Sequence, residues 1–286
     1  MALTVEAERP RAHRMSVAAN AFLADARHAQ IAVLGTLIVL GLTAFGFAMA
    51  WWHGPAVLAG AMLAQLVGAR AVCARFDWRS PAITAASLTL LLRTDALALS
   101  VAAGVVAIGS KFVLRWNGKH VFNPANFAIV VLALSLPGAW ISPGQWGAAA
   151  WFAVALAFAG LAVTGKARRW DVSLAYLATF AAILFGRAWW YGDPLAIPLH
   201  QLQSGALLLF AFFMISDPMT TPDARPARLL HAALTAAVGA FIVFAFYRAD
   251  GMILALILTA PLVPVLDRLF PAARFAWRQP KEPARC

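Results

Sequence analysis

The sequence predicts an all-α polytopic membrane protein, with about ten transmembrane helices in two inverted five-helix repeats. The 286 residues are 62% hydrophobic and only 12% charged, whereas a soluble domain has about 45–50% apolar and about 25% charged residues. Ten apolar segments divide the chain, and the basic residues collect in every second loop between them. A soluble globular class is therefore excluded.

Eight segments are clear candidates for membrane spans, since a helix needs roughly 20 mainly apolar residues to cross the hydrocarbon core. They are Ile31–Trp51, Pro55–Val72, Leu97–Leu114, Gly147–Thr164, Val172–Trp189, Leu202–Ile215, Ala227–Phe246 and Met252–Leu269. Two more are shorter or interrupted, Pro81–Leu92 and His120–Leu136. A division at the basic loop Lys166–Arg169 leaves five spans in each half. Because each half has an odd number of spans, the second half begins on the opposite side of the membrane and runs in the opposite sense to the first.

This organisation leaves one transmembrane domain between two tails. Residues 1–29 are expected to form a cytoplasmic tail, in which residues 14–28 are either an interfacial helix or a frayed end. The transmembrane domain covers residues 30–270, with repeat one at about 30–137 and repeat two at about 146–270. Residues 271–286 form a basic cytoplasmic tail.

The net charge of +11 is an orientation signal. With the N-terminus in the cytoplasm, 20 of the 23 Lys and Arg residues fall on the inner side of the ten spans. Cytoplasmic loops carry an excess of Lys and Arg in membrane proteins. We therefore expect both termini in the cytoplasm and no nucleic-acid partner.

Polar residues near two span ends are the candidate functional residues. Lys119, His120, Asn123 and Asn126 mark the start of the interrupted span, and Asp217 ends the eighth span. Asparagine is a good helix N-cap and proline suits the first helical position, so Asn123-Pro124 predicts a helix start. Such a start directs backbone N–H groups and a partial positive charge at whatever lies beyond it. The alternative is purely structural, namely a capped, shortened helix and a proline stop after Asp217.

No metal site or catalytic constellation is expected. Two cysteines cannot supply a four-thiolate iron–sulfur or zinc site, and the six histidines contain no pair at i, i+4 spacing. No Ser/His/Asp arrangement and no pair of carboxylates within one span is present.

Four short motifs resemble, in order and spacing, those of the NqrB/RnfD family. They are Gly118-Lys-His-Val-Phe-Asn123-Pro124-Ala125, Ser216-Asp217-Pro218, Asp250-Gly-Met252 and Pro261-Leu-Val-Pro264-Val-Leu-Asp267. The family comprises membrane subunits of the sodium-pumping NADH:quinone oxidoreductase and of the Rnf ferredoxin:NAD oxidoreductase. The resemblance covers roughly Pro81–Asp267 and implies ten helices in two inverted five-helix repeats, in a bacterial-type inner membrane.

The resemblance implies a flavin, but its covalent attachment site is missing. Many family members hold FMN through the threonine of an S-G-A-T motif in the outer loop after the Asn-Pro-Ala helix. This chain has no such threonine between Leu136 and Gly147, and Ser204-Gly205-Ala206 is followed by Leu207 two spans later. We therefore expect no covalent FMN. A non-covalent flavin (FMN or riboflavin) or a quinone is the cofactor class that the resemblance leaves open.

The leading hypothesis is an integral membrane subunit of an Rnf/Nqr-like system that moves electrons across the membrane with ion coupling. Lys119, His120, Asn123 and Asn126 would contact the cofactor or quinone, and Asp217 would couple an ion or proton. Because the chain carries no soluble redox module, it would need the bilayer and other membrane or soluble redox subunits as partners and would not be catalytic alone. Two alternatives remain: a urea-transporter-like channel or transporter of a small solute or ion without a redox cofactor, and a scaffold that only anchors redox partners.

Overall fold

The computed structural model describes residues 25–142 and 150–277 and is mainly helical. Five segments within it are long and apolar enough to cross a membrane. They are α2 (Ala26–Thr43), α3 (His53–Ala71), α8 (Trp170–Tyr191), α11 (Arg225–Phe246) and the continuous run Gly251–Leu269, which consists of α12 (Gly251–Thr259), η3 (Ala260–Leu262) and α13 (Val263–Leu269). The predicted class of an all-α polytopic membrane protein is confirmed.

The other helices are shorter or bent. Three of them are apolar: α5 (Leu97–Val113), α6 (Pro124–Ser135) and α7 (Ala150–Lys166). The helix α4 (Arg79–Leu91) has 13 residues, and α9 (Ala196–Leu202) meets α10 (Gly205–Leu209) and the π-helix η2 (Phe210–Met214) at a 48° bend. Each of the ten predicted segments contains a helix, while ten complete crossings stay a prediction. The candidate interfacial helix at residues 14–28 lies almost wholly outside the described residues.

The first span is shorter than its hydropathy suggests. The sequence predicts a span to Trp51, but α2 ends at Thr43. Gly46 has a φ of +61°, a left-handed conformation that glycine adopts readily. The chain then turns back, and the backbone N–H of Phe47 donates to the carbonyl of Gly41. The apolar residues after Thr43 therefore pack against the helix instead of extending it.

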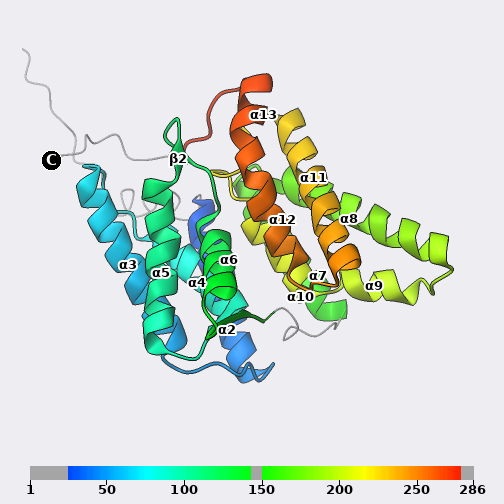
Figure 1. Ribbon diagram of the computed structural model, residues 1–286, viewed down its shortest axis with the longest axis horizontal. Helices are drawn as coiled ribbons and strands as arrows, with labels where there is room; N and C mark the ends of the chain where they lie inside the picture. Colours follow the sequence, from blue (N-terminus) through cyan, green and yellow to red (C-terminus); the bar gives the residue numbers. More distant parts are fainter. Residues whose placement is uncertain (1–24, 143–149, 278–286) are drawn as a thin grey trace, which may run out of the picture.

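The two halves of the chain pack their helices in matching pairs. In the first half α2 packs on α4, α3 on α5, and α5 on α6; in the second half α7 packs on α10, α8 on α11, and α11 on α12. The division into two five-helix repeats stays a prediction. The helices α3 and α5 run side by side (Figure 1) and approach most closely where Gly60 faces the carbonyl of Val101 and Gly104 faces that of Val57. Small residues at such crossings allow membrane helices to pack tightly.

Within residues 25–142 and 150–277 the strands form two short antiparallel ladders. The strand β1 (Leu92–Thr94) pairs with β4 (Ala139–Ile141) after α4 and α6. The strands β2 (Arg115–Trp116) and β3 (Lys119–His120) form a hairpin between α5 and α6. Its turn residues Asn117 and Gly118 have φ values of 46° and 75°, the conformation that favours Asn-Gly in two-residue hairpins.

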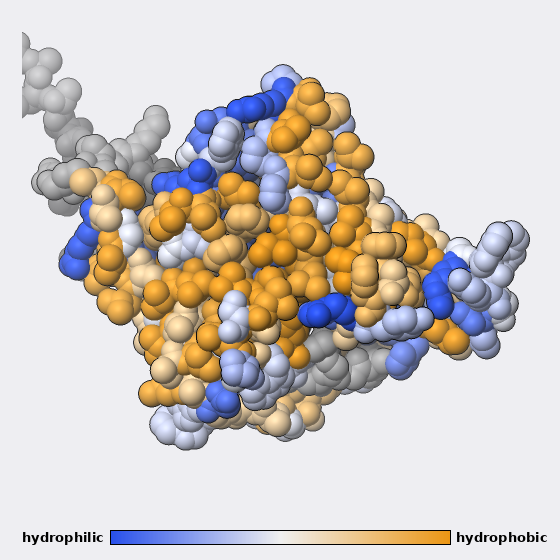
Figure 2. Space-filling view, viewed as in Figure 1, coloured by the Kyte–Doolittle hydropathy of each residue, from blue (hydrophilic) through white to orange (hydrophobic). Residues whose placement is uncertain are grey.

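The hairpin β2–β3 lies at one end of the bundle, together with the loops that carry most of the basic residues. We call this the basic end. Side-chain contacts join its loops directly: Arg27 with Asp77, Lys119 with Asp223 and Asp267, and Arg274 with the carbonyl of Asn117. Hydrophobic residues cover much of the face shown in Figure 2, and hydrophilic ones gather mainly toward its rim. The loops expected on the same side of the membrane therefore do meet in space.

Candidate functional site

A cavity of about 300 Å³ lies at the basic end, between the two halves of the chain. The first half contributes α2 to α6 and the hairpin, and the second half contributes α7, η2 and the loop after η2. His120, Asn123 and Asp217 all line this basic-end cavity. Three of the five sequence-predicted site residues are thus brought together, although about 90 residues separate Asn123 from Asp217.

Asn123 begins α6 and connects it to the second half. Its side-chain Oδ1 accepts from the backbone N–H of Asn126 at 3.1 Å, which makes it the predicted N-cap. Its Nδ2 donates to the carbonyl of Met214 at 3.2 Å and to Oδ2 of Asp217 at 3.3 Å. The asparagine therefore combines the structural role with a position on the cavity wall.

Asp217 is positioned by the π-helix η2. Single π-helical turns within helices frequently occur at functional sites, and here η2 ends just before Ser216 and Asp217. The carboxylate accepts from the backbone N–H of Met219 at 3.0 Å and lies 4.0 Å from Nε2 of His120. Burial by itself would raise the pKa of Asp217, but His120, the Met219 N–H and the charge of Lys111 together lower it below its usual value. The group is therefore ionised at neutral pH.

Asn126 and Lys119 are placed elsewhere. Asn126 is buried, and its Nδ2 donates to the carbonyl of Ile253 at 2.9 Å, which joins α6 to α12. The ammonium of Lys119 donates to the carbonyl of Thr221 at 2.6 Å and pairs with Asp267 at 3.0 Å and Asp223 at 3.3 Å. This cluster borders a separate cavity of about 170 Å³, whose walls include His120.

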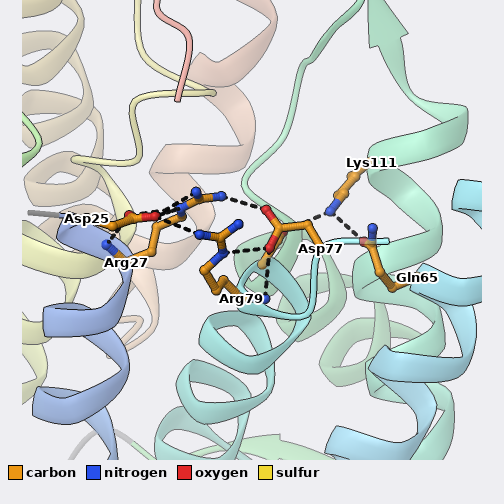
Figure 3. Close-up of polar contacts among 7 residues, drawn as sticks. Asp25, Arg27, Gln65, Asp77, Arg79 and Lys111 are labelled. Atoms are coloured by element: carbon orange, nitrogen blue, oxygen red, sulfur yellow. Dashed lines mark hydrogen bonds and ion pairs between the residues drawn. The ribbon is translucent and has the colours of Figure 1, made fainter. Parts of the chain in front are cut away.

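The cavity also holds polar residues that sequence reasoning missed. Lys111 of α5 donates to Oε1 of Gln65 at 2.7 Å (Figure 3). It also donates to Oγ of Ser80 at 2.8 Å. In the sequence Lys111 counts only as a loop charge, because it stands two residues before the end of an apolar helix. The position of Lys111 inside an apolar helix could have identified it, because an ionisable side chain within a membrane segment costs free energy and is usually kept for a function.

A four-membered ion cluster borders the same cavity. Arg27 pairs with Asp25 at 2.7 Å and with Asp77 at 2.6 Å, and Arg79 pairs with both carboxylates at 2.9 Å (Figure 3). Burial by itself would raise the pKa of Asp77, but the hydrogen bond from Arg79 and the charge of Arg27 lower it below 3.8. The cluster ties the start of α2 to the loop before α4.

Aromatic side chains cover the remaining walls. Phe112, Phe212, Phe213 and Trp277 line the cavity, and the Arg27 guanidinium stacks 4.8 Å from the Trp277 ring centre. The segment from 271 to 277 is held across the basic end, because the Phe275 N–H donates to Asp223 at 3.1 Å. Within the described residues no group of three or more His, Cys, Asp or Glu side chains could hold a metal ion.

The fold and the cavity define the class: a multi-pass membrane protein with a polar cavity between its two helical halves. The model of the NQR2, RnfD, RnfE family matches residues 138–276. The RnfD component of the ion-translocating oxidoreductase complex is 35% identical over 103 residues in Citrobacter koseri and 34% identical over 125 residues in Escherichia coli strain SE11. These matches cover 36% and 43% of the chain and 29% and 34% of the relatives.

The family model and the relatives agree with the resemblance to the RnfD/NqrB family that the motifs predict. The family match contains three of the four motifs, and the Asn123-Pro124-Ala125 motif precedes it. The chain spans only about a third of the length of the relatives it matches. The family model matches mainly the second half of this chain.

Proposed function

We propose that the chain is the RnfD-type membrane component of an ion-translocating electron-transport complex and that the basic-end cavity binds a non-covalent flavin. The observation that carries this proposal is the cavity itself, which brings His120, Asn123 and Asp217 together between the two halves. The names of the relatives support an oxidoreductase complex, and other subunits of such a complex are the proposed partners.

The chemistry of the cavity walls fits a flavin. A flavin ring is planar and rich in hydrogen-bond acceptors, and the walls offer an amide in Gln65, an ammonium in Lys111 and an imidazole in His120. Phe112 and Trp277 supply aromatic faces. A volume of about 300 Å³ is at the lower end of the range of roughly 300–1,000 Å³ for small-molecule sites. When bound, a flavin would supply reversible uptake of electrons.

The residues of this chain would orient the ring and control its surroundings. Asn123 fixes the start of α6 against the second half, and Trp277 and Arg27 stack on one another in the cavity wall. Asp217 lies on the cavity wall beside Asn123 and His120, and we propose that it couples an ion or a proton. Lys119 and Asn126 would then shape the site from outside the cavity.

The proposed setting is a bacterial inner membrane with the basic end in the cytoplasm, as the excess of Lys and Arg in cytoplasmic loops predicts. A pore on the same bundle receives less support. A separate cavity of about 10 Å³ shares Ser87 and Phe213 with the basic-end cavity and is lined mainly by apolar side chains such as Leu34, Leu90 and Leu209.

The absorption spectrum of the full chain, purified in mild detergent from its native membranes, tests this function. We expect the two bands of an oxidised flavin, bleached by dithionite, and release of the flavin by acid precipitation because no covalent bond holds it. A colourless protein would contradict the proposal.

A variant pair then locates the flavin. Asn123→Ser keeps a good N-cap for α6 but removes the amide, and we expect it to lose most of the flavin. The control Gln201→Ser, on the exposed face of α9, should retain it. Equal flavin content in both variants would place the flavin outside the cavity.

A further inference from the structure

Lys111 has polar partners in the cavity, and all of them are neutral. Its ammonium donates to Oε1 of Gln65 and to Oγ of Ser80. Among the ion pairs of the described residues, which reach to 4.0 Å, none contains this lysine. An ammonium has three donors, so two are used by the protein and one is left for another acceptor.

The other charges along the cavity wall already have partners. Arg27 is paired with Asp25 and Asp77. The carboxylate of Asp217 accepts from Asn123 and from a backbone N–H. Arg115 is exposed and donates to the carbonyl of Gly118. Lys111 and Arg115 both lack a carboxylate in direct contact among the ion pairs of the described residues, but Arg115 is exposed to solvent whereas Lys111 is half-buried. Lys111 is therefore the less solvated of the two cations.

An ammonium in such a place favours a ligand with negative charge. The cost of holding a charge away from bulk water falls when an opposite charge lies beside it. A flavin that accepts two electrons and one proton carries one additional negative charge on its ring, and the oxidised ring is neutral there. A fixed cation stabilises the reduced form more than the oxidised form and so raises the reduction potential.

We propose that Lys111, held by Gln65 and Ser80, is the counter-charge for the reduced, anionic ring of the flavin in the basic-end cavity. This inference rests on the proposed function. It names Lys111 as a residue that sets the potential of the site, in addition to the residues that the motif supplies. Gln65 and Ser80 are positioning residues that hold the ammonium at the cavity wall.

The test is a spectroelectrochemical titration of the purified full chain with its flavin, in which the electrode supplies the electrons and the buffer the proton. Lys111→Met should weaken the binding of the reduced flavin by a factor at least tenfold larger than the factor by which it weakens the binding of the oxidised flavin. That change lowers the midpoint potential by about 30 mV for a two-electron couple. Lys111→Arg should keep most of the wild-type potential, because it keeps the charge. The control Lys166→Met removes an exposed lysine at the end of α7 and should leave the potential unchanged.

The outcomes separate this inference from the proposed function. If Lys111→Met binds flavin with the wild-type potential, the inference is wrong and the proposed function stands. Equal weakening of oxidised and reduced flavin, measured by equilibrium dialysis, would also overturn it, because Lys111 would then only shape the site. If the wild-type chain binds no flavin, both fail together.

Discussion

Lys119 and Lys111 lie near the same end of the bundle, but their surroundings predict different effects on stability. Lys119 pairs with Asp267 and Asp223, and these three side chains are only 12%, 22% and 11% exposed. Lys119→Met would leave two carboxylates without their cation. Removal of one partner from a buried pair costs about 3–5 kcal/mol. Since Asp267 is about one-fifth exposed, we expect about 3 kcal/mol, at the lower end of that range.

The assay is thermal unfolding in detergent, followed by intrinsic fluorescence. A loss of about 3 kcal/mol corresponds to a decrease of roughly 5 °C in the midpoint for a chain of this size, because the entropy of unfolding is about 2.1 cal/mol/K per residue. The matched variant Lys111→Met removes an ammonium with neutral partners only, so its midpoint should change by less than about 3 °C. Equal effects of the two substitutions, in either direction, would refute the assignment of the carboxylates to Lys119.

Three further predictions concern the ion cluster, the helix packing and the orientation. The pKa of Asp77 is lowered below 3.8, so the ionised Asp77 carboxylate stabilises the folded state above pH 3.8, and this stabilisation is lost as the pH falls below that value. The unfolding temperature should therefore drop on acidification below about pH 4, and it should drop less steeply in Asp77→Asn. Gly60→Ala should lower the free energy of unfolding by about 1–3 kcal/mol, because the new methyl group meets the backbone of α5. The control Gly109→Ala places its methyl group in open space and should be neutral or slightly stabilising. Denaturation midpoints in detergent compare the two variants. Single cysteines in loop 167–169 should react with impermeant thiol reagents only from the cytoplasmic side, and those in loop 192–195 only from the other side. The reverse pattern would invert the proposed orientation.

The local structure around Asn123 was predictable because each signal depends on neighbouring residues only. The Asn-Pro pair specifies a capped helix start, and the Asn117-Gly118 turn specifies a two-residue hairpin. Both are present. The end of α2 at Thr43 was not predictable from hydropathy. The apolar residues after Thr43 are equally compatible with a longer membrane span and with a segment that turns back and packs on the helix.

The grouping of the site residues could be predicted only in part. Asn123, His120 and Asp217 meet as expected, because Asn123 and His120 precede α6 and Asp217 follows η2 at the same end of the bundle. The partners of Lys119 come from residues 104 and 148 positions further along the chain, and no local pattern shows that Asp223 and Asp267 would hold it outside the cavity. Lys111 was missed for the same reason, since its partners in α3 and α4 become visible only in three dimensions.

Cryo-electron microscopy of the chain in its native complex would show whether a redox group occupies the space between the two halves at the basic end. We expect density for a planar ring bounded by Lys111, His120 and Asn123, with no covalent link to the protein. Density for a lipid tail there, or close packing of the walls with the flavin located on another subunit, would contradict the proposed function.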